Sequence, residues 1–87
     1  MIRMFLRHEV SDYEAWRKVY DGFDRSALGV VSAAVYRSLD DPNDVTVVHD
    51  FESAEAAHEF ADAGDLENAM RHAGVTSTPT VWFTTPS

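Results

Sequence analysis

The order of strand-like and helix-like segments constrains the fold of this chain more than any other feature. Segments with two-residue alternation and segments with helical spacing follow one another as β-α-β-β-α-β within 87 residues. This order builds a four-stranded antiparallel sheet that carries both helices on one face. The opposite face of the sheet is then left uncovered, so the order predicts an architecture and also a surface that needs a cover.

Four segments alternate between apolar and more polar side chains, as strands with one buried face do. In the first of them, Ile2, Met4 and Leu6 lie on the same side. Pro79 opens the last segment and suggests an edge position in the sheet or a bend where the strand begins, because proline cannot donate a ladder hydrogen bond. We expect strands at about 2–9, 30–38, 45–51 and 78–84.

The two helical segments carry start and stop signals. Ser11 and Glu14 form an S-x-x-E capping box at the start of the first helix, and Ser53 is placed to cap the second. Gly64 interrupts the second helix, which should restart at Asp65. A stripe of apolar residues along the first helix predicts that this helix packs on the sheet: Tyr13, Trp16, Val19, Tyr20 and Phe23.

Composition excludes several classes of partner. The chain has 15 acidic and 7 basic residues and a net charge of −8, which disfavours nucleic acid and anionic membrane surfaces. No apolar run is long enough to span a bilayer, and Arg3 and Arg7 interrupt the first apolar stretch, which argues against a signal peptide. The chain has no cysteine, so disulfides and thiolate chemistry are excluded, and we expect a cytoplasmic protein.

The length predicts one domain that covers residues 1–87. We expect this domain to be α+β with the ferredoxin-like βαββαβ order and a four-stranded antiparallel sheet. A domain of this size has a modest core and gains stability from association. A second copy of the chain is the obvious cover for the open face.

Alternation divides the strand residues into two faces. The more apolar face should pack under the helices: Ile2, Met4, Leu6, Val31, Ala33, Val35, Val45, Val47, Phe51, Val81 and Phe83. The other face mixes aromatic and charged residues: Arg3, Phe5, Arg7, Ser32, Ala34, Tyr36, Thr46, Val48, Asp50, Thr80, Trp82 and Thr84. This mixture suits a partly polar cavity enclosed between two sheets, where a small molecule could bind.

Several stretches resemble small bacterial proteins of the dimeric α+β-barrel superfamily, which includes the antibiotic biosynthesis monooxygenase-like domains. The resemblance covers nearly the whole chain, and four stretches carry it: RHEVSDYxxW at 7–16, the DPN turn at 41–43, FxSxExAxxF at 51–60 and AMxxAGV at 69–75. The resemblance implies that two sheets pack face to face as a homodimeric barrel. Members of the superfamily include cofactor-independent monooxygenases, haem-degrading enzymes, polyketide cyclases and lactone isomerases.

Eight residues are candidates for a site on the open face. We expect His8, Arg7 and Tyr36 to be catalytic. A second group would bind substrate: Arg3, Phe5, Asp50, Trp82 and His49. Arginines facing a cavity could hold a carboxylate or an enolate. Six of these candidates also have a structural alternative: an ion pair of Arg3 or Arg7 with Asp50 or with a partner's acid, interface packing for Tyr36 and Trp82, and a structural hydrogen bond for His8.

The sequence contains no metal motif, because none of its four histidines forms an H-x-H or H-x-x-x-H pair. His58 and His72 fall on helices and are expected at the surface. No glycine-rich phosphate loop and no nucleophile elbow occurs. We therefore expect no bound cofactor.

Two functional hypotheses follow. The first is an enzyme for a small aromatic or hydrophobic molecule, either a cofactor-independent monooxygenase or a polyketide cyclase, with its substrate on the sheet face turned away from the helices. The second is a non-catalytic dimeric binding or accessory domain whose barrel is filled by side chains. A cavity with convergent polar groups favours the first hypothesis, and a filled interior favours the second.

Overall fold

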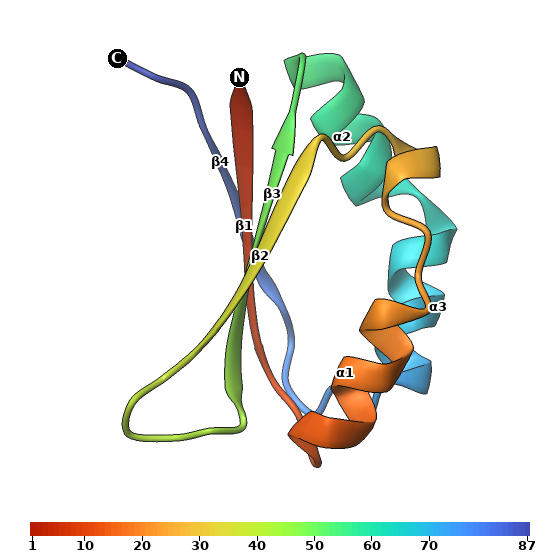
Figure 1. Cartoon of the computed structure of the whole chain (residues 1–87), viewed down its shortest axis with the longest axis vertical. Helices are drawn as coiled ribbons and strands as arrows, with labels where there is room; N and C mark the ends of the chain where they lie inside the picture. Colours follow the sequence, from red (N-terminus) through yellow and green to blue (C-terminus); the bar gives the residue numbers. More distant parts are fainter.

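The computed structural model describes the backbone of residues 1–87 and every side chain except that of Asp65. Figure 1 shows a twisted sheet with all the helices on one face. The elements follow in this order: β1 (Ile2–Glu9), α1 (Tyr13–Asp21), the short 3₁₀ helix η1 (Ser26–Leu28), β2 (Ser32–Arg37), β3 (Asp44–Phe51), α2 (Ala54–Asp62), α3 (Gly64–His72) and β4 (Thr80–Thr84). The α+β class and the βαββαβ order are confirmed, with the second helix divided into α2 and α3.

The sheet has the strand order β2-β3-β1-β4, and all its neighbouring strands are antiparallel. The two longest strands, β1 and β3, therefore lie in the centre and are covered best. Strand β4 lies at an edge, one of the two possibilities that Pro79 suggested. The register places Met4 opposite His49, and His8 opposite Val45.

The helix boundaries correct one prediction. Asp12, not Ser11, is the N-cap of α1, because its carboxylate accepts from the backbone N–H groups of Glu14 and Ala15 at 3.0 and 3.4 Å. Ser53 caps α2 as predicted, with Oγ accepting from the Ala56 N–H at 3.1 Å. The chain leaves helical geometry at Ala63 and resumes it at Gly64, one residue earlier than expected.

The core lies between the centre of the sheet and the helices. Met4, Val45 and Phe51 from the sheet and Phe60 from α2 are almost completely buried. The expectation that Val31 packs under the helices is wrong, because Val31 precedes β2 and is half exposed. Val81 is also 39% exposed, since β4 is an edge strand. The helices therefore cover the two central strands and leave the edges partly open.

Among the described residues, no helix has the length and the apolar character that crossing a bilayer requires.

Candidate functional site

The structure separates the eight candidate residues into two groups on opposite faces of the sheet. Side chains of residues that face each other across a ladder lie on the same side. Because Met4 opposes His49 and His8 opposes Val45, both histidines lie on the face that the helices cover. The open face holds the other six: Arg3, Phe5, Arg7, Tyr36, Asp50 and Trp82. A single site on the open face cannot include His8 or His49.

Arg3 on the open face is paired within its own chain. Its guanidinium donates to both Asp50 carboxylate oxygens, at 2.8 and 3.2 Å, and the Ser32 hydroxyl donates to the same carboxylate at 2.7 Å. These hydrogen bonds hold the pKa of Asp50 below its usual value. This is the ion pair that was the structural alternative for Arg3.

Arg7 forms a similar pair further along the same strand. Its guanidinium reaches both oxygens of Asp44, at 3.0 and 2.5 Å, and this contact lowers the pKa of the Asp44 carboxyl. Both pairs are partly exposed to solvent through their arginines. The two open-face cations are thus already satisfied without a ligand.

Aromatic side chains lie between these ion pairs. Phe5 and Trp82 stack with ring centres 5.1 Å apart, and Trp82 and Tyr36 remain 40% and 59% exposed. Hollows of about 390 and 420 Å³ lie on this face, and both contain Phe5 and Tyr36 in their walls. The open face therefore has an exposed aromatic centre and charges at its margins.

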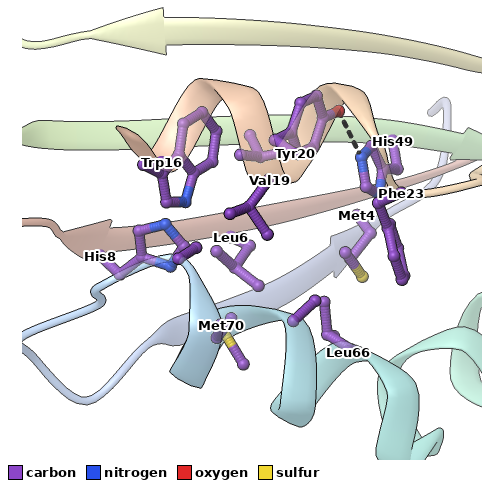
Figure 2. A pocket seen from close by; sticks show the side chains of 13 residues that line it. Met4, Leu6, His8, Trp16, Val19, Tyr20, Phe23, His49, Leu66 and Met70 are labelled. Atoms are coloured by element: carbon purple, nitrogen blue, oxygen red, sulfur yellow. Dashed lines mark hydrogen bonds between the residues drawn. The ribbon is translucent and has the colours of Figure 1, made fainter. Parts of the chain in front are cut away.

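The covered face contains a different kind of space. A cavity of about 40 Å³ lies between the sheet, α1 and α3, and its walls are almost entirely apolar (Figure 2). Strands β1 and β3 contribute Met4, Leu6, His8, Val47 and His49, and the helical side contributes Trp16, Val19, Tyr20, Phe23, Leu66, Ala69, Met70 and Ala73. Figure 2 shows His8 and His49 at opposite ends of this cavity.

His8 is buried in this cavity without a partner. Only 3% of the residue is exposed, and neither ring nitrogen has a hydrogen-bond partner among the described residues. Its ring meets Trp16 edge to face, with centres 5.8 Å apart. Burial lowers the pKa of His8 from 6.5 to about 4, so the imidazole is neutral at pH 7.

His49 is buried at the other end of the cavity, at 2% exposure. Its Nε2 atom lies 2.8 Å from the Tyr20 hydroxyl, whereas Nδ1 has no partner within the described part of the chain. Burial lowers the pKa of His49 to about 4, and the positive charge of Arg25 adds to this effect. This imidazole is neutral at pH 7 as well.

The cavity combines features that are common in small-molecule sites. Buried polar atoms are normally hydrogen-bonded, and unpaired ones carry a free-energy cost of about 1–3 kcal/mol each. A neutral imidazole in apolar surroundings can accept a proton or bind a polar group of a ligand. No group of three or more potential metal-ligating side chains occurs among the described residues. The arrangement therefore suits proton transfer to and from an apolar molecule.

Sequence reasoning did not recognise this cavity, although one signal was present. His8 follows Leu6, and His49 follows Val47, at the two-residue spacing that places side chains on one face. That spacing could have assigned both histidines to the covered face. The residues of the first helix that line the cavity were expected as core, and the existence of a cavity among them depends on side-chain packing.

No protein-family model matches the chain, and no curated protein matches it. Solved structures do match in fold. A protein from Bordetella bronchiseptica, named as a candidate antibiotic biosynthesis monooxygenase, is 21% identical with a TM-score of 0.73 over 99% of this chain and 96% of its own. A candidate of the same name from Deinococcus radiodurans is 15% identical with a TM-score of 0.75 over 100% and 93%.

A third similar structure is a variant of SnoaB, named as a cofactor-independent oxygenase from Streptomyces nogalater. It is 14% identical with a TM-score of 0.73 over 98% of this chain and 91% of its own. The chain has the fold of antibiotic biosynthesis monooxygenase-like proteins. This likeness confirms the resemblance seen in the sequence at the level of fold, and fold alone does not determine the reaction.

Proposed function

We propose that this protein is a cofactor-independent monooxygenase that binds a small aromatic or otherwise conjugated molecule in the cavity between the sheet, α1 and α3. The observation that carries the proposal is His8, a buried and neutral imidazole with two unpaired nitrogens in an apolar cavity. The similar fold of SnoaB, named as a cofactor-independent oxygenase, supports the reaction class.

The proposed reaction begins with proton transfer to His8 from an acidic C–H group of the substrate. The imidazolium and the substrate anion then stabilise each other, which raises the basicity of His8 when substrate is bound. The electron pair of the substrate carbanion forms a C–O bond with O₂, and the resulting peroxide takes the proton back from His8. Loss of water leaves a carbonyl group, so the sum is R₂CH₂ + O₂ → R₂C=O + H₂O.

Apolar walls assist this chemistry in two ways. They favour O₂ and the ring system of the substrate over water, and they strengthen the attraction between the imidazolium and the substrate anion. At about 40 Å³, the cavity must enlarge to admit a ring system. Met70 and Leu66 on α3 have flexible side chains that can move aside, methionine especially.

We further propose that residues 1–87 form one domain of a homodimer, in which the open face of one sheet covers the open face of the other. Exposed Tyr36 and Trp82 provide an apolar centre, and the Arg3–Asp50 and Arg7–Asp44 pairs surround it. In this proposal the six open-face candidates serve association. Sedimentation at micromolar concentration should give twice the mass of the chain, and a monomer would rule the dimer out.

Oxygen uptake tests the proposed reaction directly. Anthrone and hydroxylated naphthalenes should consume O₂ faster with the wild-type protein than without it, and His8→Gln should remove most of that acceleration. Arg7→Gln is the control, because it changes the neighbouring residue on the opposite face. Turnover of these compounds without O₂ consumption would favour a cyclase, and no turnover together with a dry, unliganded cavity would favour the non-catalytic alternative. Either result would overturn the oxygenase proposal.

A further inference from the structure

The second histidine of the cavity makes a contact that His8 lacks. His49 Nε2 lies 2.8 Å from the Tyr20 hydroxyl, across the interface between β3 and α1 (Figure 2). The imidazole also stacks against the Tyr20 ring and meets Phe60 edge to face, with ring centres 6.0 and 5.1 Å away. These neighbours fix the plane of the ring, so His49 is held in one orientation.

The contact with Tyr20 determines which nitrogen of His49 carries the proton. Burial raises the pKa of Tyr20, so its hydroxyl remains protonated and has one hydrogen to donate. Its hydroxyl makes no other hydrogen bond among the described residues, and an imidazole nitrogen with a lone pair is a strong acceptor. Tyr20 therefore donates to Nε2, which leaves the proton of the neutral ring on Nδ1.

Arg25 strengthens this assignment. Its guanidinium lies over the Tyr20 ring, 4.3 Å from the ring centre, and its Nη1 atom donates to the Tyr20 carbonyl oxygen at 2.6 Å. A positive charge beside the phenol makes its hydroxyl a better donor, and it also disfavours a second proton on His49. The expected state is a neutral His49 with a buried Nδ1–H donor that has no acceptor among the described residues.

The two histidines therefore differ in what they offer a ligand. His8 can accept a proton, whereas His49 Nδ1–H can only donate a hydrogen bond. Met4 faces His49 across the ladder and lies four residues before His8 on β1, which places the two imidazole-bearing positions ~13 Å apart along the strand. The side chains between them are apolar, among them Leu6 and Val19.

We infer that Tyr20 is a positioning residue that holds His49 as an Nδ1–H donor for a carbonyl oxygen, so that the cavity selects an elongated conjugated molecule with a carbonyl at the His49 end and an acidic proton at the His8 end. In such a molecule, the charge created by proton loss at one end moves through the conjugated system to the oxygen at the other. This inference deepens the proposed function and rests on it for the role of His8, but the hydrogen-bonding state of His49 is independent of any turnover.

Long-range ¹H–¹⁵N NMR correlations of the histidine rings test the first part. In the wild-type protein, His49 should carry its proton on Nδ1. Tyr20→Phe should convert His49 to a mixture of tautomers, and the matched control Tyr13→Phe on the same helix should leave it unchanged. A wild-type His49 protonated on Nε2, or a His49 unaffected by Tyr20→Phe, would overturn the inference.

Binding measured by NMR titration tests the second part without requiring catalysis. The probes are a hydroxytetralone with its hydroxyl and keto groups at opposite ends of the ring system, plain tetralone, and the tetrahydronaphthol that lacks the keto group. The hydroxytetralone should bind at least about tenfold more tightly than either partner compound. Tyr20→Phe should weaken the two ketones and spare the tetrahydronaphthol. Equal affinities for all three, or equal losses in Tyr20→Phe, would contradict the selection proposed here, whatever the outcome of the oxygen-uptake assay.

Discussion

The polar residues on the two faces of the sheet differ in burial and in hydrogen bonding. On the open face, Arg3 and Arg7 lie in partly exposed positions and each is paired with an aspartate of the same chain. On the covered face, His8 and His49 are almost fully buried, yet three of their four ring nitrogens have no partner among the described residues. Exposed ion pairs change the free energy of unfolding little, whereas buried nitrogens without a hydrogen-bond partner lower it. This difference supports the proposal that the functional site lies on the covered face.

Replacing the polar residues on the two faces should have very different effects on turnover. His8→Gln should lower kcat/KM for an accepted substrate by about 100-fold or more, the usual range for loss of a general base. Arg7→Gln, on the opposite face, should stay within about twofold of wild type. Steady-state oxygen uptake measures both. A larger loss of kcat/KM in Arg7→Gln than in His8→Gln would mean that the site lies on the open face.

As the pH falls, the buried histidines of the covered face should destabilise the protein before the aspartates of the open face do. The pKa of His8 and His49 is about 4 in the folded protein against 6.5 for the free side chain, so the unfolded chain binds more protons between these values. The free energy of unfolding should be highest above pH 6.5 and should fall as the pH drops toward 4, by up to roughly 3 kcal/mol for each histidine.

Urea unfolding at a series of pH values measures this dependence. In a double variant, His8→Leu with His49→Phe, the free energy of unfolding should be nearly independent of pH between 6.5 and 4.5. The control His72→Gln, at an exposed position, should keep the wild-type pH dependence. The open-face carboxylates Asp44 and Asp50 act at lower pH, because their pKa values lie below the usual range. A slope unchanged in the double variant would show that the two histidines are not buried as described.

A larger side chain in the cavity should prevent ligand binding on the covered face while the protein still folds. Ala69 lines the cavity on α3, and Ala69→Phe adds more volume than the cavity of about 40 Å³ can hold without displacement of its neighbours. Ligand binding should be lost, with a destabilisation of about 1–3 kcal/mol from overpacking. Asn68→Phe, at the adjacent exposed position, is the control and should bind normally. Normal binding by Ala69→Phe would place the ligand elsewhere.

A substitution on the open face should weaken dimerisation and leave ligand binding in the cavity unchanged. Trp82→Ser removes an exposed aromatic side chain that stacks on Phe5, and it should shift the protein toward monomer in sedimentation experiments. Ligand affinity in the cavity should stay close to the wild-type value, because Trp82 does not line it. Loss of ligand binding with retained association would reverse the roles assigned to the two faces.

The sequence predicted the fold closely because its signals are local. Alternation defined the strands to within about two residues, and Gly64 marked the break between α2 and α3. The error at Ser11 arose because the neighbouring Asp12 is an equally good cap and lies at the position that the backbone uses. Local patterns cannot distinguish two adjacent capping residues when tertiary contacts decide between them.

The site was less predictable because it depends on long-range packing. Charge and aromatic content drew attention to Arg3, Arg7 and Trp82, and the pairing of Arg3 with Asp50 was among the structural alternatives. The partner of Arg7 was not foreseen, because Asp44 lies on the neighbouring strand β3 and the sequence places it in a turn. His8 and His49 are neutral at pH 7 because α1 and α3 bury them, and burial lowers the pKa of each. The two-residue spacing of Leu6 and His8, and of Val47 and His49, indicates the covered face, but no local pattern reports a cavity or the missing hydrogen-bond partners there.

The free energy of unfolding of His8→Leu tests the central claim most directly. Leucine fills a similar volume and removes two unpaired nitrogens. If the fold tolerates His8 at a cost in stability, His8→Leu should be more stable than wild type at pH 7 by at least about 1 kcal/mol. Urea unfolding monitored by tryptophan fluorescence gives this value. A variant that is less stable by a similar amount would mean that His8 supports the fold, and it would contradict the assignment of the covered face as the functional site.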